Sequence, residues 1–204
     1  MNGTKPSRKR FDSGYFDKWY RHPKHRVGTQ ADLARLVRFA LAATEYVLAH
    51  PVRSVLDVGA GEGRWFPVLQ KMRPRIRYQG VDPSDYVVRR FGKRRNIVRG
   101  TLDDLPGLFP DAKFDLVVCC SVINYMPSDE VVRAMRNIVA RTAGVAYLEI
   151  FTTDDHVEGD TEGWHSETRT VYRRMIREAG LIPCGLHCYV PGTNSDALVE
   201  LERA

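Results

Sequence analysis

The sequence predicts an α/β protein with a doubly wound, mostly parallel sheet and helices on both faces. Three observations support this prediction. Short apolar runs alternate with segments of helical periodicity over most of the 204 residues. A glycine cluster follows the first apolar run, at the point where a strand would turn into a helix. The last two predicted strands have no helix between them, so they should pair as a hairpin and make one strand antiparallel.

The first 50 residues are expected to precede the sheet. In residues 11–26, aromatic side chains are interleaved with charges, and that much aromatic surface needs a partner. We therefore expect a short amphipathic helix or lid there. The run Thr29 to Asp32 resembles a capping box and should open a helix that ends near His50. The expected organisation is a disordered tail over 1–10, an aromatic arm and helix forming a lid over 11–50, and one domain over 51–204.

From residue 51 onward, the elements follow in a regular order. Ser128 and Ser166 are plausible N-caps, and Gly180 suits the position after a helix end. The expected strands are Ser54 to Val58, Ile76 to Val81, a short strand from Ile97, Phe114 to Cys120, Gly144 to Phe151, Leu181 to Val190 and Ala197 to Leu201. The expected helices cover Arg64 to Lys71, Ser84 to Phe91, the segment after Ser128 and the segment after Ser166.

The first motif with chemical content is Asp57-Val58-Gly59-Ala60-Gly61-Glu62-Gly63, where the first strand meets a helix. Glycines allow positive φ and close approach of the backbone to a ligand, and helix N-terminal amides then face the bound group. Dinucleotide enzymes share such turns. However, their fingerprint requires a small residue where Arg64 stands, and the Asp57 carboxylate would repel a pyrophosphate. A carboxylate there suits a ligand with a cationic amine.

Three further motifs follow the next three strands. Asp82 with Pro83 ends the second strand, where an acidic side chain can accept hydrogen bonds from both ribose hydroxyls; a helix N-cap is its alternative role. Leu102-Asp103 follows the third strand, where a carboxylate could accept from an adenine amino group, the alternative being an ordinary surface turn. The fourth strand continues into Ser121, beside the same crevice.

In this order, the motifs resemble the class I S-adenosylmethionine-dependent methyltransferases over roughly Val52 to Leu201. The resemblance implies a seven-stranded sheet with the last strand antiparallel and S-adenosyl-L-methionine as cofactor. It places the cofactor's methionine portion on the glycine turn, with two carboxylates near its amino group. By this resemblance the cofactor-binding residues are Asp57, Gly59, Ala60, Gly61, Glu62, Asp82, Pro83, Leu102, Asp103 and Ser121. The N-terminal arm resembles, in its aromatic residue types but not in a sequence motif, the arm that closes over the cofactor in small-molecule members of the family. Its residues expected at the cofactor are Tyr15, Trp19 and Tyr20.

Departures from the family pattern narrow the expected acceptor. Members that methylate planar amino groups carry an Asn/Asp-Pro-Pro-aromatic run after the fourth strand, whereas this chain has Ser121-Val122-Ile123-Asn124-Tyr125. The metal-dependent catechol type has an Asp at that strand end, and Cys119-Cys120-Ser121 offers none, so no metal is expected. The resemblance therefore favours transfer of a methyl group to an O or N nucleophile of a small molecule.

An oxygen or protonated nitrogen acceptor would also need a base. We expect His165 or Tyr125 to fill the catalytic role, with His156 and Glu149 as further candidates on the same edge. Trp164 could be a pocket wall or core, and His165 could equally be a surface residue capping a loop.

The amino-acid composition limits which other classes of protein the sequence could represent. A hydrophobic share of 43% with 27% charged residues indicates a globular chain, and no apolar run reaches membrane-spanning length. The absence of a signal-like segment and the cysteine pattern indicate a cytoplasmic protein. The net charge of +6 leaves nucleic acid possible but not favoured, because the arginines are spread along the chain. An RNA or protein methyltransferase and a non-catalytic cofactor-binding module stay open as alternatives, as does the oligomeric state.

Overall fold

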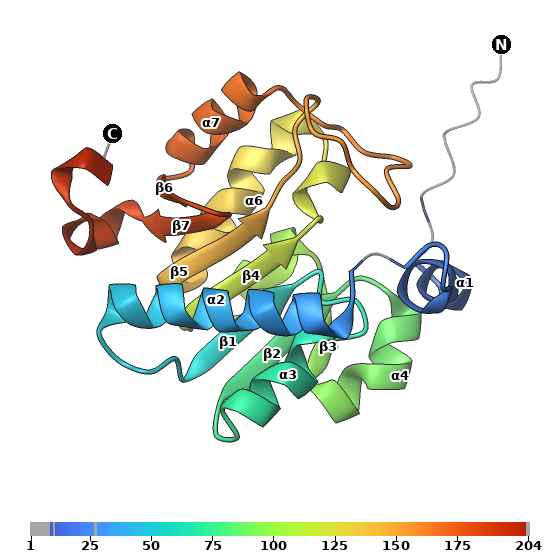
Figure 1. Ribbon diagram of the computed structural model, residues 1–204. Coiled ribbons are helices and arrows are strands. Elements are labelled where there is room, and N and C mark those ends of the chain that lie inside the picture. Colours follow the sequence, from blue (N-terminus) through green and yellow to red (C-terminus); the bar gives the residue numbers. More distant parts are fainter. Residues whose placement is uncertain (1–8, 10, 27, 203–204) are drawn as a thin grey trace, which may run out of the picture.

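One seven-stranded sheet forms the centre of the molecule in the computed structural model, which describes residue 9, residues 11–26 and residues 28–202. The strand order is β3-β2-β1-β4-β5-β7-β6, as Figure 1 shows. β7 runs antiparallel to both of its neighbours, and the other pairs are parallel. The seven-stranded, mostly parallel sheet is therefore confirmed. The strands are β1 Ser54–Val58, β2 Arg77–Asp82, β3 Ile97–Arg99, β4 Phe114–Cys120, β5 Thr142–Glu149, β6 Leu181–Gly185 and β7 Cys188–Pro191.

The closing hairpin exists, but the expected residues were wrong. The segment from 181 to 190 is two strands with a tight turn, because Leu186 and His187 both adopt positive φ, 48° and 65°. Two such residues in succession reverse the chain with the twist that a hairpin requires. A Leu-His pair lacks the usual Asn-Gly signal, so the run looked continuous in sequence. Residues 192–202, expected to hold the last strand, instead form two 3₁₀ turns, η4 Gly192–Ala197 and η5 Glu200–Glu202.

Helices cover both faces of the sheet. Strand side chains alternate between the faces, so Val55 contributes to one apolar cluster and Leu56 to the other. The first cluster contains residues of α2 Gln30–Leu48 and α3 Trp65–Met72, and the second contains residues of α6 Ser128–Arg141 and α7 Arg169–Glu178. The remaining helical elements are α1 Ser13–Phe16, η1 Asp17–Arg21, α4 Asp85–Arg95, η2 Leu102–Asp104, α5 Leu105–Leu108 and η3 Ile123–Tyr125.

Helix starts were predicted with mixed success. The capping box between Thr29 and Asp32 is present at the start of α2 and confirms that prediction. The two serine caps were wrong. Pro127 occupies the N-cap position of α6, while the Ser128 hydroxyl donates to Glu167. Thr168, not Ser166, caps α7, because Ser166 lies in the irregular segment before it, where its hydroxyl accepts from Asn124.

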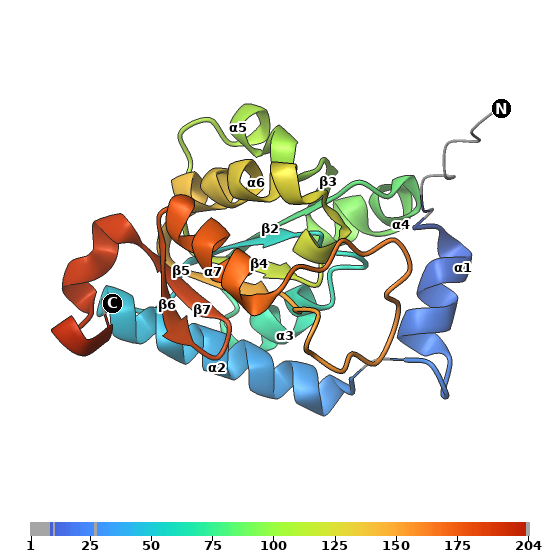
Figure 2. The ribbon, with the colours of Figure 1, turned by 90° about the horizontal axis from the view of Figure 1, so that it is seen from above.

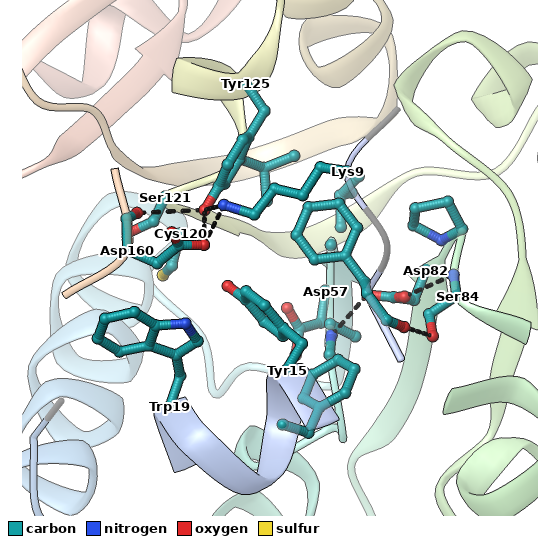
Figure 3. A pocket seen from close by; sticks show the side chains of 18 of the residues that line it. Lys9, Tyr15, Trp19, Asp57, Asp82, Ser84, Cys120, Ser121, Tyr125 and Asp160 are labelled. Carbon is teal, nitrogen blue, oxygen red and sulfur yellow. Dashed lines mark hydrogen bonds and ion pairs between the residues drawn. The ribbon is translucent and has the colours of Figure 1, made fainter. Parts of the chain in front are cut away.

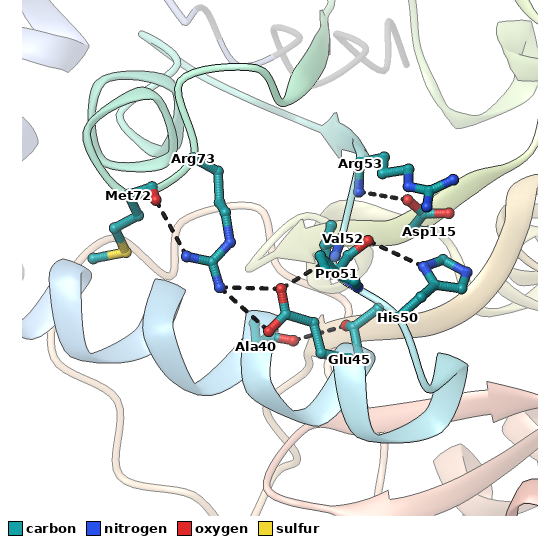
Figure 4. A network of polar contacts seen from close by, with 10 residues as sticks. Ala40, Glu45, His50, Pro51, Val52, Arg53, Met72, Arg73 and Asp115 are labelled. Carbon is teal, nitrogen blue, oxygen red and sulfur yellow. Dashed lines mark hydrogen bonds and ion pairs between the residues drawn. The ribbon is translucent and has the colours of Figure 1, made fainter.

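Polar contacts stabilise the end of the sheet at which β1 and β4 begin (Figure 4). One Asp115 carboxylate oxygen accepts from the backbone amides of Arg53 and Ser54, at 2.6 and 3.0 Å. Nearby, Glu45 near the end of α2 accepts from the Val52 amide at 3.1 Å and pairs with Arg73. These contacts fix the entry of the chain into β1 at the edge opposite to its glycine turn.

The N-terminal arm and the loop after β5 extend toward each other at the other edge (Figure 2). In the arm, Phe16 is buried against Val87, Phe91 and Ile97. By contrast, α2 is buried along one side against the sheet, so we propose that a movable lid comprises residues 11–26 and not the whole of 11–50.

The predicted disordered tail lies outside the described residues, apart from residue 9. Among the described helices, none is long and apolar enough to cross a membrane.

Candidate functional site

A large cavity of about 2410 Å³ opens at the edge where the parallel strands end (Figure 3). Its walls include the turns after β1, β2 and β4, the N-terminal arm and the loop after β5. In open α/β sheets, ligands bind beyond the carboxyl ends of the strands, where the strand order reverses. Here the order reverses between β1 and β4, so the cavity lies where the fold favours a ligand. Its volume exceeds what one small ligand needs, which leaves room for two molecules side by side.

The glycine turn requires glycine at two positions. Gly59 has a φ of 70° and Gly61 a φ of 53°, a region that other residues rarely adopt. A Cβ on Gly59 would approach Val122 to 2.2 Å, and one on Gly61 would approach the Tyr20 hydroxyl to 2.5 Å. The turn is therefore in contact with the end of β4 on one side and with the arm on the other.

Two buried carboxylates flank this turn. Asp57, 4% exposed, accepts a 2.7 Å hydrogen bond from the Tyr78 hydroxyl. Burial raises the pKa of Asp57 to about 7; the Tyr78 hydrogen bond opposes this rise and the charge of Asp82 adds to it. Asp82 accepts from the amides of Gly61 and Ser84, at 2.8 and 2.9 Å. Burial also raises the pKa of Asp82, against those two hydrogen bonds. An uncompensated buried carboxylate is costly, so this corner suits a cationic or hydroxyl-bearing ligand.

The predicted helix-cap alternative for Asp82 is not what the structure has. Ser84 is the N-cap of α4, and its hydroxyl accepts from the Val87 amide. The same hydroxyl donates to the Phe11 carbonyl, which ties the arm to the end of β2. Each Asp82 oxygen accepts one backbone hydrogen bond, so the carboxylate retains lone pairs for a ligand.

Glu62 lies away from the cavity, which differs from its expected place beside the cofactor's amino group. Its carboxylate forms an ion pair with Arg21 of the arm and a 3.4 Å contact with the Tyr86 hydroxyl. Arg95 donates to its backbone carbonyl. Glu62 and Arg21 instead line a smaller cavity, which shares Tyr20 and Arg64 with the large one. Glu62 therefore links the arm to the glycine turn.

Leu102 and Asp103, the residues expected at an adenine ring, lie with Pro83 on one flank of the large cavity. Pro83 is exposed, Leu102 is buried and Asp103 is exposed. The Asp103 carboxylate is paired with the Arg133 guanidinium through contacts of 2.9 and 3.1 Å. Ala60 and Ser121 also line the cavity, and the Ser121 hydroxyl donates to Glu149 at 2.7 Å. Apart from Glu62, the cavity brings together every residue that the resemblance assigned to the cofactor.

Asn124 organises the wall opposite that flank. It is fully buried and exchanges two hydrogen bonds with the backbone of Phe151, at 2.7 and 3.1 Å. Its backbone carbonyl accepts from the His165 amide at 2.7 Å. The side chain and the backbone of Asn124 together thus hold both ends of the loop after β5 against η3. No local pattern indicates this role, because Phe151 and His165 lie 27 and 41 residues further along the chain.

Aromatic rings line this second part of the cavity. Trp164 stacks on Phe151 and meets Tyr125 edge to face, with ring centres 5.7 and 5.9 Å apart. Trp164 is thus a pocket wall. The arm contributes Tyr15 and Trp19, which are half-buried along the same cavity. Burial is also the main reason that the pKa of Tyr15 lies above its ordinary range.

His165 lines the cavity but is exposed, and its position differs from the expected one in one respect. The helix expected after Ser166 begins at Arg169, so His165 does not adjoin a helix N-terminus. His156 is exposed and is not among the residues that line the cavity.

Lys9 and Asp160, which the sequence did not single out, form an ion pair beside the Tyr125 hydroxyl. Over the residues that the structure describes, no group of three His, Cys, Asp or Glu could hold a metal.

Comparison with known proteins defines the class. The family model described as a methyltransferase domain matches residues 25–192. The chain therefore belongs to this methyltransferase family, which confirms the resemblance drawn from the motifs. No curated protein sequence matches the chain.

Solved structures share the fold at low sequence identity. Magnesium protoporphyrin IX methyltransferase from Synechocystis PCC 6803, with SAH bound, has a TM-score of 0.60 and 17% identity over 88% of this chain and 92% of that one. An O-methyltransferase of neocarzinostatin biosynthesis has a TM-score of 0.53 and 20% identity over 78% and 55%. A [4+2]-cyclase, SpnF, has a TM-score of 0.55 and 21% identity over 82% and 63%. The fold alone thus also occurs in a protein named for another reaction.

Proposed function

We propose that the chain binds S-adenosyl-L-methionine in the large cavity and transfers its methyl group to an O or N nucleophile of a small molecule. The observation that carries the proposal is the pairing of the Gly59–Gly61 turn with two buried carboxylates, Asp57 and Asp82. A cationic amino group beside Asp57 and ribose hydroxyls beside Asp82 would satisfy these groups. In this proposal Pro83, Leu102 and Asp103, which line the same cavity, flank the adenine ring.

When bound, the cofactor supplies an electrophilic methyl group, so the protein's task is mainly to orient the acceptor and exclude water. The arm serves the second purpose in this proposal. Tyr20 covers Gly61, and Ser84 holds the arm through the Phe11 carbonyl. The acceptor would lie against the aromatic wall of Tyr125, Trp164 and Phe151.

His165 and Tyr125 are the proposed groups for removing or holding the acceptor's proton. Both line the cavity on the side of the aromatic wall. Tyr125 is held by a 3.2 Å hydrogen bond from its hydroxyl to the Asp160 carbonyl, which fixes its ring beside that wall. A positioned hydroxyl suits acceptor orientation, whereas an imidazole suits proton removal near neutral pH.

Calorimetry with S-adenosylmethionine tests the proposal. We expect micromolar binding by the wild type and a loss of tenfold to more than a hundredfold in Asp82→Ala, from roughly 1.5–3 kcal/mol of lost charge-assisted hydrogen bonds. Asp111→Ala is the control, because Asp111 is exposed and does not line the cavity. Equal binding by wild type and Asp82→Ala would refute the assignment. Tight binding without transfer to any of a broad acceptor panel would indicate a non-catalytic module.

A further inference from the structure

The ammonium group of Lys9 lies in the acceptor part of the cavity (Figure 3). It forms an ion pair with Asp160, donates to the Glu162 carbonyl at 2.8 Å and lies 3.4 Å from the Tyr125 hydroxyl. It also lies 4.7 Å from the centre of the Tyr125 ring, within the range of a cation–π contact. The side chains of Lys9 and Asp160 are only 19% and 10% exposed, so this pair is largely removed from water.

The partners of this ammonium group belong to two separate parts of the protein. Asp160, Glu162 and Tyr125 belong to the wall of the cavity. Phe11 and Tyr15, whose ring centres lie 5.8 and 5.6 Å from the ammonium, belong to the arm and would move with it. The wall therefore offers a carboxylate, a carbonyl and an aromatic face to any ammonium group that reaches it.

The charge of the loop after β5 agrees with this preference. Residues 149–165 contribute Glu149, Glu158, Asp160 and Glu162 to the cavity lining and contain no lysine or arginine. Without Lys9, the nearly buried Asp160 carboxylate would lose its cationic partner, and a buried unpaired charge is costly. A cationic ligand would restore the charge pairing, whereas an alcohol could donate only a neutral hydrogen bond and a carboxylate would be repelled.

We propose that the methyl acceptor is an alkyl amine, bound through its ammonium group by Asp160, the Glu162 carbonyl and the Tyr125 ring, and that the amine displaces the Lys9 ammonium from this position. This inference rests on the proposed function. It selects nitrogen over oxygen and assigns Asp160 as an acceptor-binding residue. Lys9 precedes the arm, so it can withdraw without disturbing the sheet.

The reaction balances without a further reagent. The bound ammonium loses one proton to the proposed base, His165, which exposes the nitrogen lone pair; His165 later releases the proton to solvent. The nitrogen then bonds to the methyl carbon as the carbon–sulfur bond breaks, and the electrons of that bond stay on sulfur. The sulfonium becomes a neutral thioether, and the methylated nitrogen carries the positive charge. No metal or redox partner takes part in these steps.

Binding of n-butylamine and 1-butanol to the protein saturated with S-adenosylhomocysteine tests the inference. n-Butylamine reproduces the side chain of Lys9, and 1-butanol is its uncharged match. We expect Lys9→Met, which keeps side-chain length without charge, to bind the amine at least about tenfold more tightly than wild type does, because the competitor is gone. In the Lys9→Met background, Asp160→Asn should lose about tenfold or more, the scale of one charge-assisted hydrogen bond. Asp154→Asn, an exposed carboxylate of the same loop, is the matched control.

The possible outcomes distinguish failure of the proposed function from failure of the amine assignment. Failure of S-adenosylhomocysteine to bind wild type would overturn the proposed function, and this inference with it. If S-adenosylhomocysteine binds normally, two results would overturn the amine assignment alone. One is that Lys9→Met binds butylamine and butanol with equal affinity. The other is that Asp160→Asn does not change the affinity for butylamine. With S-adenosylmethionine, Lys9→Met should then give N-methylbutylamine by mass spectrometry. Transfer only to hydroxyl acceptors would overturn the inference while keeping the methyltransferase.

Discussion

The pKa of Asp57 leads to a specific prediction for cofactor binding. Burial raises this pKa to about 7. In our proposal, Asp57 faces the cationic amino group of S-adenosylmethionine, and only the ionised carboxylate attracts that group. At pH 6 about one molecule in ten carries an ionised Asp57, against about nine in ten at pH 8. The affinity for the cofactor should therefore rise about tenfold between these pH values, equivalent to about 1.4 kcal/mol.

Calorimetry at about pH 6, 7 and 8, in buffers of different ionisation enthalpy, measures both the affinity and the proton released on binding. Asp57→Asn should bind more weakly at pH 8 and lose most of the pH dependence. Tyr78→Phe removes the hydroxyl that donates to Asp57, so its pKa should rise further and the midpoint should move to higher pH. A wild-type affinity that stays flat from pH 6 to 8, or an equal slope in Asp57→Asn, would refute the reasoning.

The Asp57 carboxyl group also makes the free energy of unfolding depend on pH when no cofactor is added. The pKa of Asp57 is raised from 3.8 to about 7 on folding, so between these values the folded state binds more protons than the unfolded one. The contribution of Asp57 to the free energy of unfolding should therefore fall as the pH rises from about 4 to about 7. This sign is opposite to that of a salt-bridged carboxylate. Denaturant titrations of wild type and Asp57→Asn at both ends of that range should differ by this contribution.

Three further predictions concern the arm, the sheet edge and the candidate base. Deleting residues 1–26 should leave a cooperative thermal transition while weakening cofactor protection against proteolysis; an unfolded product would make the arm part of the core. Asp115→Ala should cost about 1–3 kcal/mol in thermal denaturation, because the Ser54 amide loses its partner, with cofactor affinity unchanged; an altered affinity would contradict the separation of the two sheet edges. His165→Ala should lower turnover by roughly 10²-fold if the imidazole removes a proton, with cofactor affinity nearly unchanged. Normal turnover would leave Tyr125 as the group to test.

The central part of the sheet was predictable because its signals are local. β1 and β4 are short apolar runs bounded by turn residues, and a buried parallel strand needs little else. The glycine turn was predictable for the same reason, since positive φ at Gly59 and Gly61 is a requirement of the chain itself. The capping box of α2 likewise depends on two residues only three positions apart.

The C-terminal third shows where local signals fail. The reversal at Leu186 and His187 uses residues that do not usually adopt positive φ, so tertiary contacts decide it. β7 pairs with β5, which lies some 40 residues earlier, at Tyr147 and Cys188. The N-cap of α7 is Thr168 and not Ser166, whose hydroxyl instead accepts from the Asn124 side-chain amide. No pattern within the segment itself contains that information.

The sequence by itself determined the fold class, the family and the glycine turn with Asp57 and Asp82, because each depends on the order and spacing of residues close together in the chain. Only the tertiary structure decided that Glu62 faces Arg21 and not the cavity. It alone joined Lys9 to Asp160, 151 residues apart. Contacts across such separations form when the sheet brings the arm and the loop after β5 to one end. The part of the cavity proposed for the acceptor is therefore a product of topology, whereas the part proposed for the cofactor is largely a product of local sequence.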